Sequence, residues 1–224
     1  MLRLIPPMLL ALALAAPAAA ETRALSDFSA VSINDRVTVQ IATGPTYSVE
    51  VTGSDAARIR TQVEGRTLRI RDANRPWFGE TPDLDAQIRI TAPAIERIGA
   101  ARGAEVDATL TACSNLDVSA AMGAAARIVA PECQAIDATA SMGGELRLDG
   151  ACQTLSASAS MGGLIKAETM RCLSVDASAS MGGDVQAYAR RSFDASAAMG
   201  GAINVEGDAP RRQASSSLGG SVNH

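Results

Sequence analysis

A short unit that recurs at an almost constant interval constrains the fold of this chain more than any other feature. Each unit is a small residue followed by methionine and glycine, and successive copies lie 18–20 residues apart. Degenerate copies at residues 101–103 and 217–219 flank the series, as terminal repeats of a stacked array tend to do. The five complete copies are centred on Met122, Met142, Met161, Met181 and Met199.

Apolar and polar residues alternate before each methionine, which is the pattern of a half-buried β-strand. The glycines after the methionine allow the positive φ angles of a corner, and a second short alternating strand follows. Strands of repeats about 19 residues long pair with those of the next repeat, which predicts a β-solenoid. We expect alanines and methionines to stack inside a thin core, while aspartates and serines line the outside.

The repeats predict a single-stranded parallel β-helix over residues 93–224, about 29 Å long if its rungs are one strand spacing apart. Residues 21–92 have alternating strands separated by glycine and proline, which indicates an antiparallel-like β segment that caps the first rung. Trp77 and Phe78, the only adjacent aromatic residues, are expected to pack on this cap.

The first twenty residues have the three parts of a secretory signal peptide. Arg3 supplies the positive charge, an apolar run follows, and Ala18 and Ala20 are small residues at the positions that a signal peptidase reads. The chain is therefore predicted to be exported to the periplasm or the extracellular space. No later segment approaches the roughly 20 apolar residues of a transmembrane helix, so no integral membrane segment is expected after cleavage.

Composition argues against several classes of function. The net charge of −4 at pH 7 disfavours nucleic acid as a partner. The single histidine, His224, is the last residue, which argues against histidine-based catalysis and against a histidine-rich metal site. We find no catalytic constellation and expect no cofactor or bound metal. Rungs of 18–20 residues also leave no room for the long inserts that form clefts in β-helical polysaccharide lyases and hydrolases.

Four cysteines stand nine residues before successive methionines and therefore form a column in register. In an oxidising compartment, a strand spacing of about 4.8 Å is compatible with a disulfide between neighbours. If all four cysteines pair with neighbours, the disulfides are Cys113–Cys133 and Cys152–Cys172. A Cys133–Cys152 disulfide is the competing bond. The other alternative is that all four are reduced thiols in the core. A straight row of thiols cannot form a tetrahedral zinc site.

The outward positions of the repeats form a regular polar face. Its stacked aspartates repel one another, and one interpretation is that they recruit Ca²⁺. The favoured interpretation is a solvated surface on which neighbouring hydroxyls relieve this repulsion. The serine and threonine rows are compatible with binding of a repeating polymer and equally with ordinary solubility. The candidate binding residues are Asp117, Asp137, Thr139, Ser141, Ser158, Ser160, Asp176, Ser178, Ser180 and Asp194.

Nearly all of the chain after residue 20 resembles the GIN domain, described as the head of an auto-transporter adhesin. The features that carry the resemblance are residues 28–33 (Phe-Ser-Ala-Val-Ser-Ile), residues 65–70 (Gly-Arg-Thr-Leu-Arg-Ile), residues 88–93 (Ile-Arg-Ile-Thr-Ala-Pro) and the small-residue–glycine rungs from Ile98 to Gly220. The resemblance implies a right-handed β-helix, a location in the envelope or at the surface, and no established catalytic residues.

The leading hypothesis is an exported, non-catalytic, adhesin-like module that binds an envelope or extracellular polymer or protein through its polar face. The first alternative is a structural envelope protein that self-associates through the free strand edge of its last rung. The second alternative is an enzyme that acts on polysaccharides.

Overall fold

The repeats stack in register because equivalent residues of neighbouring rungs pair as parallel strands. The computed structural model describes residues 21–23, 27–74, 82–111 and 113–224, and within these ranges it contains strands and one short 3-10 turn. The predictions of a signal peptide at residues 1–20 and of packing by Trp77 and Phe78 concern residues outside the described ranges. No helix in the described part of the chain has the length and hydropathy to cross a membrane.

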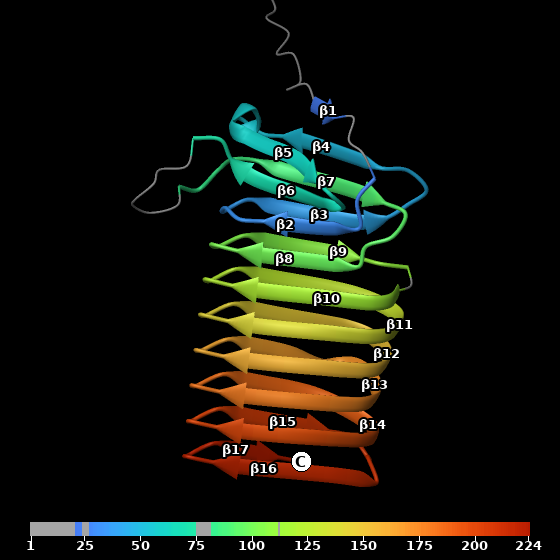
Figure 1. Cartoon of the computed structure of the whole chain (residues 1–224), viewed down its shortest axis with the longest axis vertical. Coiled ribbons are helices and arrows are strands. Elements are labelled where there is room, and N and C mark those ends of the chain that lie inside the picture. The colour runs from blue at the N-terminus through green and yellow to red at the C-terminus, as the bar shows by residue number, and fades with distance from the viewer. Residues whose placement is uncertain (1–20, 24–26, 75–81, 112) are drawn as a thin grey trace, which may run out of the picture.

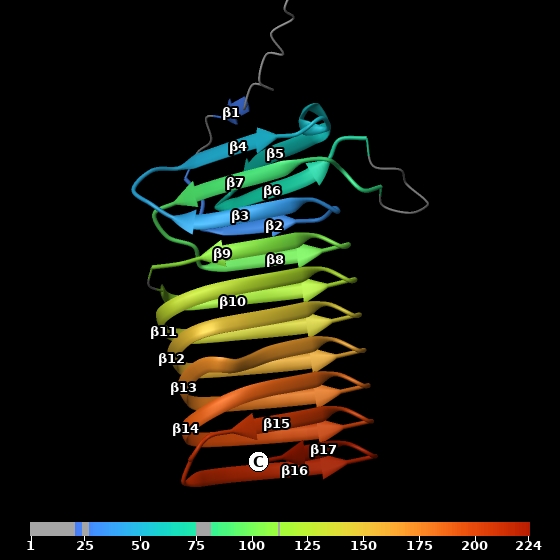
Figure 2. The same cartoon turned by 180° about the vertical axis from the view of Figure 1, so that it is seen from behind.

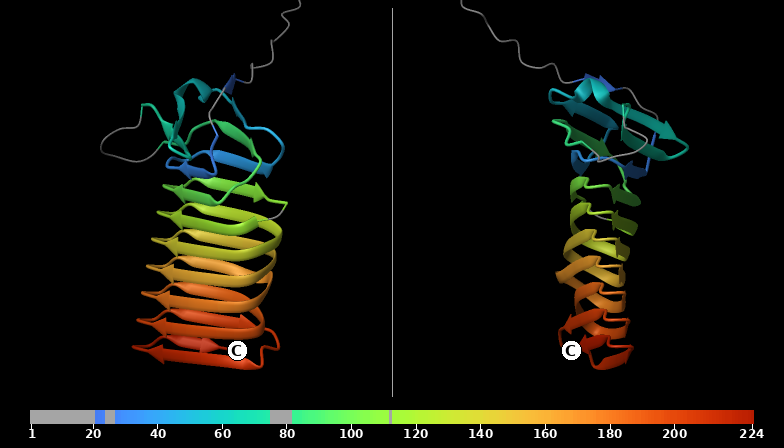
Figure 3. Two further views of the ribbon diagram at one scale, coloured as in Figure 1. Left: turned by 45° about the vertical axis from the view of Figure 1, so that its right-hand side comes forward. Right: turned by 90° about the vertical axis from the view of Figure 1, so that its left-hand side faces the viewer.

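Each rung has two straight segments, one in each of two facing layers (Figures 1 and 3). From the N-terminal end the chain winds clockwise as it moves away, which confirms a right-handed β-solenoid (Figures 1 and 2). The solenoid strands are β8 (Arg97–Ala101), β9 (Glu105–Thr109), β10 (Cys113–Ala121), β11 (Ala125–Ser141), β12 (Glu145–Ser160), β13 (Leu164–Ser180), β14 (Asp184–Ala198), β15 (Ala202–Glu206), β16 (Arg211–Ser217) and β17 (Ser221–Asn223).

The two edges of the solenoid differ. We call the layer that contains β8, β10 and β16 the first layer and the layer that contains β9, β15 and β17 the second layer. At one edge the chain turns sharply, and at the other it follows a rounded arc. Strands β11 to β14 each run from the second layer round the arc into the first (Figure 1). In the first layer, the inward residues next to the sharp turn are alanines, such as Ala138 and Ala140 in β11, which are fully buried. Small side chains let the layers approach closely, so the core is thin, as predicted (Figure 3).

The sharp edge consists of two-residue turns in which methionine and glycine both have positive φ. After β12 the φ angles are 49° at Met161 and 73° at Gly162. The amide of Gly163 donates a hydrogen bond of 2.9 Å to the carbonyl of Ser160, which closes a type I′ turn. Such turns bring the chain from one layer to the other within four residues, which accounts for the repeated glycine.

The prediction that the methionines point into the core is wrong. Met122, Met142, Met161, Met181 and Met199 are 41–50 % exposed. The alternation of inward and outward side chains ends at the strand end, because a left-handed backbone conformation directs the methionine Cβ away from the layers. The stacking itself is confirmed, since the Gly143 amide donates a 3.2 Å hydrogen bond to the Met161 carbonyl of the next rung.

Residues before the repeats form a mixed β cap on the first rung. In this region, β2 stacks in parallel on β8 and β3 stacks in parallel on β9, so this strand pair acts as one more rung. Strand β4 is antiparallel to β7, and β5 is antiparallel to β6. The elements are β1 (Glu21–Arg23), β2 (Ala30–Ile33), β3 (Thr38–Thr43), β4 (Ser48–Thr52), η1 (Ala56–Arg58), β5 (Ile59–Glu64), β6 (Thr67–Asp72) and β7 (Gln87–Ala92).

The antiparallel arrangement expected from the sequence is therefore correct for β4 and β5 and incorrect for β2 and β3. Alternation of apolar and polar residues shows which side of a strand is buried but does not give its direction. The connection from β2 to β3 passes between the two layers, as the rung turns do, instead of forming a hairpin within one layer.

A buried polar network joins the cap rung to the strands above it. Asp72 and Asp35 are 5 % and 1 % exposed, and an Asp35 carboxylate oxygen accepts a 2.8 Å hydrogen bond from the Asp72 amide. The Asp72 carboxylate accepts a 2.7 Å hydrogen bond from the Arg58 guanidinium. These bonds compensate for the removal of the carboxylates from water, since buried charges need a partner.

A small pH-dependent contribution to stability is expected from the second layer. Lys166, the larger cause, and Arg147 donate hydrogen bonds to Glu145 and lower the pKa of its carboxyl from the ordinary value of 4.5. A lowered folded-state pKa means that this stabilisation is complete above about pH 4.5 and is lost as the pH falls through the folded-state value. We expect Glu145→Gln to lower the unfolding free energy by a few tenths of a kcal/mol at pH 7, because these partly exposed pairs are screened.

Urea denaturation at pH 7 and pH 3 measures this effect, and the difference between the variant and the parent should be smaller at pH 3 than at pH 7. Glu105→Gln is the matched control. Glu105 occupies the same register column two rungs away, and its carboxylate forms no ion pair with another described residue. An equal loss of unfolding free energy in both variants would show that the ion pairs of Glu145 are not the cause.

Candidate binding groove and face

The predicted polar face exists as a set of columns on the first layer. Residues five positions before each methionine pair across neighbouring rungs, so Asp117 lies beside Asp137, and Asp176 lies beside Asp194. Ser156 separates these two pairs of carboxylates and thereby reduces their mutual repulsion. The complete column reads Arg97, Asp117, Asp137, Ser156, Asp176, Asp194 and Gln213.

Two columns of hydroxyl groups adjoin the aspartate column on the same face. One places Thr139, Ser158 and Ser178 in register, and the other places Ser141, Ser160 and Ser180 in register. The hydroxyls of Ser158 and Ser178 are 2.8 Å apart and form a hydrogen bond. All ten candidate residues thus belong to one continuous surface, as the alternation in the sequence predicts.

The structure also contains a groove that sequence reasoning missed. It encloses about 1880 Å³ and extends along the solenoid from residues 94–97 to residues 211–213, between the aspartate column and the rounded arc. Each rung contributes the segment that leads from the arc into the first layer, for example residues 132–137 of β11. The four candidate aspartates line one side of the groove, whereas the candidate serines and threonine lie beyond its rim.

The groove carries positive charge toward its C-terminal end. Arg171, Arg190 and Arg211 line the groove in successive rungs and are exposed. The Arg171 guanidinium lies 4.0 Å from the centre of the Tyr188 ring, where the π electrons hold it in place. None of these three arginines pairs with an acidic residue in the described part of the chain, so their hydrogen-bond donors are available to a ligand.

At the opposite end, the first aspartate of the column is already paired. The Arg97 guanidinium donates a 2.8 Å hydrogen bond to the Asp117 carboxylate. The remaining carboxylates, Asp137, Asp176 and Asp194, are exposed and lack an ion pair among the described residues. The groove therefore presents carboxylate acceptors along the aspartate column and guanidinium donors toward its C-terminal end. Within the described ranges, no three histidine, cysteine, aspartate or glutamate side chains are grouped as a metal site.

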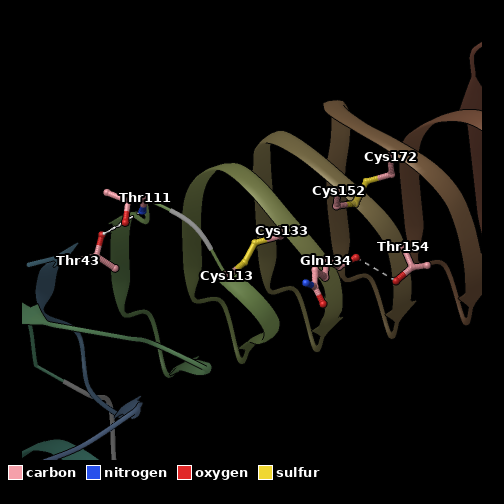
Figure 4. Close-up of a disulfide and its surroundings, with 8 residues drawn as sticks. All are labelled: Thr43, Thr111, Cys113, Cys133, Gln134, Cys152, Thr154 and Cys172. Carbon is pink, nitrogen blue, oxygen red and sulfur yellow. Dashed lines mark hydrogen bonds between the residues drawn. A yellow bond between two sulfur atoms is a disulfide. The ribbon is translucent and has the colours of Figure 1, made fainter.

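The cysteine column lies in the segment that lines the groove, and its thiols are paired as disulfides. Cys113 is bonded to Cys133 with a Cα–Cα distance of 4.6 Å, and Cys152 is bonded to Cys172 with a Cα–Cα distance of 4.4 Å (Figure 4). Of the alternatives that the sequence leaves open, pairing of adjacent rungs in two separate couples is therefore the one observed. The bridges tie neighbouring rungs together where the strands bend into the groove.

Hydrogen bonds between rungs supplement the disulfides along the arc. Thr154 donates a 3.4 Å hydrogen bond to the Gln134 carbonyl of the preceding rung. Between the cap rung and the first solenoid rung, Thr43 donates a 3.1 Å hydrogen bond to the Thr111 hydroxyl and accepts one of 3.0 Å from the Thr111 amide (Figure 4). The arc that borders the groove is thus held by covalent and polar contacts from the cap onward.

The sequence matches, over residues 27–209, the family described as "Putative auto-transporter adhesin, head GIN domain". The chain belongs to the GIN domain family. The predicted resemblance is thereby confirmed over most of the chain. No curated protein has a matching sequence.

Several solved structures share the fold. A putative adhesin from Bacteroides fragilis superposes with a TM-score of 0.82 at 20 % identity, over 92 % of this chain and 95 % of that one. A putative lipid binding protein from Parabacteroides distasonis gives 0.62 at 18 % identity, over 93 % and 97 %. A putative adhesin from Parabacteroides merdae gives 0.60 at 14 % identity, over 93 % and 96 %. At these identities the similarity establishes the cap and solenoid architecture.

Family membership and the disulfides together point to an exported or envelope protein. Disulfides persist in oxidising compartments and are rare in the reducing cytosol. The adhesin descriptions of the family and of the structural neighbours agree with an adhesin-like role.

Proposed function

We propose that the protein is a non-enzymatic, adhesin-like module that binds an extended, hydroxyl-rich polymer of the cell envelope or its surroundings along the groove and the adjoining face. The observation that carries this proposal is the continuity of the groove, which extends past every rung from Arg97 to Arg211. Rungs repeat at about 4.8 Å, so a ligand with its own repeat makes similar contacts at successive levels.

The chemistry of the lining supports a hydroxyl-bearing ligand. Carboxylates such as Asp137 and Asp176 accept hydrogen bonds from hydroxyls, and the neighbouring serine and threonine hydroxyls both donate and accept. The unpaired arginines add donors for carboxylate or sulfate groups of the same polymer. A single aromatic side chain in the groove, Phe193, is buried, so binding depends on polar contacts instead of ring stacking.

Retention of the purified protein on insoluble envelope polysaccharide tests this function. The variant Asp137→Asn with Asp176→Asn should bind at least tenfold more weakly, because hydrogen bonds to charged groups contribute about 1.5–3 kcal/mol each and about 1.4 kcal/mol corresponds to a factor of ten. Asp107→Asn with Glu206→Gln, which removes two exposed carboxylates of the second layer, is the matched control and should bind as the parent does.

Equal retention of both variants would show that the polymer does not bind in the groove. Retention on envelope proteins in place of polysaccharide would change the class of ligand. Release of new reducing or unsaturated ends during the incubation would identify an enzyme and contradict the non-catalytic assignment.

Self-association through the last rung is less well supported as the main function. In the register of β16, Arg212 and Ser216 follow Phe193 and Ala197 in the inward columns. The end of the solenoid thus replaces apolar side chains by polar ones, and the Arg212 guanidinium donates a 2.8 Å hydrogen bond to the Ala209 carbonyl. Stacking of a second copy on this end would require dehydration of these groups.

A further inference from the structure

The sharp edge of the solenoid carries a column of exposed thioethers, which we call the methionine ladder. Successive members are one strand spacing apart, since the amides of Gly123, Gly143 and Gly162 each donate a 3.2 Å hydrogen bond to the methionine carbonyl of the following rung. The groove lies on the arc side, so the ladder is a separate feature. Its members are Met122, Met142, Met161, Met181 and Met199.

Backbone conformation does not explain why methionine stands at these turns. Each methionine has a φ of 48–53°, in the left-handed region, and the first central position of a type I′ turn favours asparagine or glycine. A side chain such as methionine costs about 1 kcal/mol there relative to glycine. Five turns bear this cost, and persistent unfavourable backbone conformations are a reason to look for a role of the side chain.

Core packing does not explain the methionines either. Their side chains are 41–50 % exposed and do not belong to the hydrophobic core. The turn itself accepts other side chains, because Arg102 and Leu218 adopt the same left-handed conformation in the first and last rungs. Leu218, which lies in the exposed last rung, is 79 % exposed.

Thioether sulfur is a soft ligand, and soft ligands select Cu(I) among the metals that proteins commonly bind. All four thiols are consumed by disulfides, and the remaining described methionine, Met170, is fully buried. The ladder therefore holds the accessible soft donors of the described chain. Each side chain has three rotatable bonds, so sulfurs one strand spacing apart can turn toward a common point.

We propose that neighbouring thioethers of the methionine ladder bind Cu(I), with Met142, Met161 and Met181 as the central site. These three each have a methionine on both sides, whereas Met122 adjoins Arg102, whose positive charge disfavours a cation. Binding forms coordinate bonds from neutral sulfur atoms and involves no transfer of electrons or protons. The site does not depend on the proposed function of the groove.

The test uses the disulfide-bonded protein with Ag(I) as a redox-inert substitute for Cu(I). Methionines labelled with ¹³C in the ε-methyl group report binding by NMR. We expect the methyl signals of the central three to shift on titration with silver nitrate, while that of buried Met170 stays in place. Cu(I) under anaerobic conditions, in competition with a chromophoric chelator, should give one or two ions bound per chain.

The triple variant Met142→Leu, Met161→Leu, Met181→Leu should bind Ag(I) and Cu(I) at least tenfold more weakly. It preserves the apolar ridge, and Leu218 shows that leucine adopts this turn, so circular dichroism should report an intact fold. Met170→Leu is the matched control and should bind as the parent does. Equal binding by the triple variant, absence of methyl shifts, or the appearance of free thiols during titration would each overturn the proposal.

Discussion

Replacing Gly163 by alanine is expected to lower the free energy of unfolding by about 3 kcal/mol or more. An alanine Cβ at this position would lie 2.3 Å from the carbonyl oxygen of Ala140 in the preceding rung. The carbonyl belongs to the backbone of the adjacent rung, and the Cβ is fixed directly to the backbone of residue 163, so relief of the clash requires separation of two rungs. Overpacking typically costs about 1–3 kcal/mol and more where the neighbours cannot move.

The neighbouring glycine provides a matched control. Gly162 has a φ of 73°, and a Cβ there would have no atom within 4 Å. Gly162→Ala therefore carries only the cost of the left-handed conformation, about 1 kcal/mol, although it makes the same chemical change one residue away. Urea denaturation followed by circular dichroism measures both variants. Equal destabilisation would show that the rungs do not stack as closely as described.

Removal of the two disulfides is expected to have the largest effect of all. Each bridge joins residues 20 apart and restricts the unfolded chain by an amount worth about 3 kcal/mol. Replacing Cys113 and Cys133 by alanine, or Cys152 and Cys172, should cost about this much, and replacing all four about 6 kcal/mol. That is a large share of the roughly 5–15 kcal/mol by which domains are usually stable.

Peptide mapping without reductant tests the connectivity itself. Trypsin cleaves after Arg127, Arg147, Lys166 and Arg171, which separates the four cysteines. The expected linked pairs are residues 103–127 with 128–147, and residues 148–166 with 172–190. A peptide that joins residues 128–147 to 148–166 would contradict the observed pairing. An unchanged denaturation midpoint in the variant with all four cysteines replaced by alanine would show that the disulfides do not stabilise the fold.

The fold was predictable because the sequence has two periods, one along each strand and one from rung to rung. Alternation along the strand places Asp137 and Thr139 outward and Ala138 inward, and the repeat of about 19 residues aligns such positions from rung to rung. The polar face and the adjacent-rung disulfides follow from the same two periods. Any insertion of a single residue within a strand would have exchanged the two faces, so the pattern is highly restrictive.

The methionine position and the groove were not predictable from alternation. Strand periodicity ends at Ser160, and the side-chain direction of Met161 depends on a left-handed φ that the sequence shows only indirectly, through the glycine that follows. The groove depends on how the strands bend between the arc and the first layer, where the register shifts between Cys172 and Ser174. The uneven rung lengths of 18–20 residues are the available signal for such bulges.

The polar side chains of the last rung limit how the molecule can change in size. A further rung with apolar inward residues beneath β16 would bury Arg212 and Ser216, so adding one there carries the cost of dehydrating these two side chains. Duplication or loss of an internal rung leaves both ends intact and alters the length by one strand spacing. Relatives of different length are therefore expected to differ in the middle of the stack, with the reach of the groove changing in equal steps.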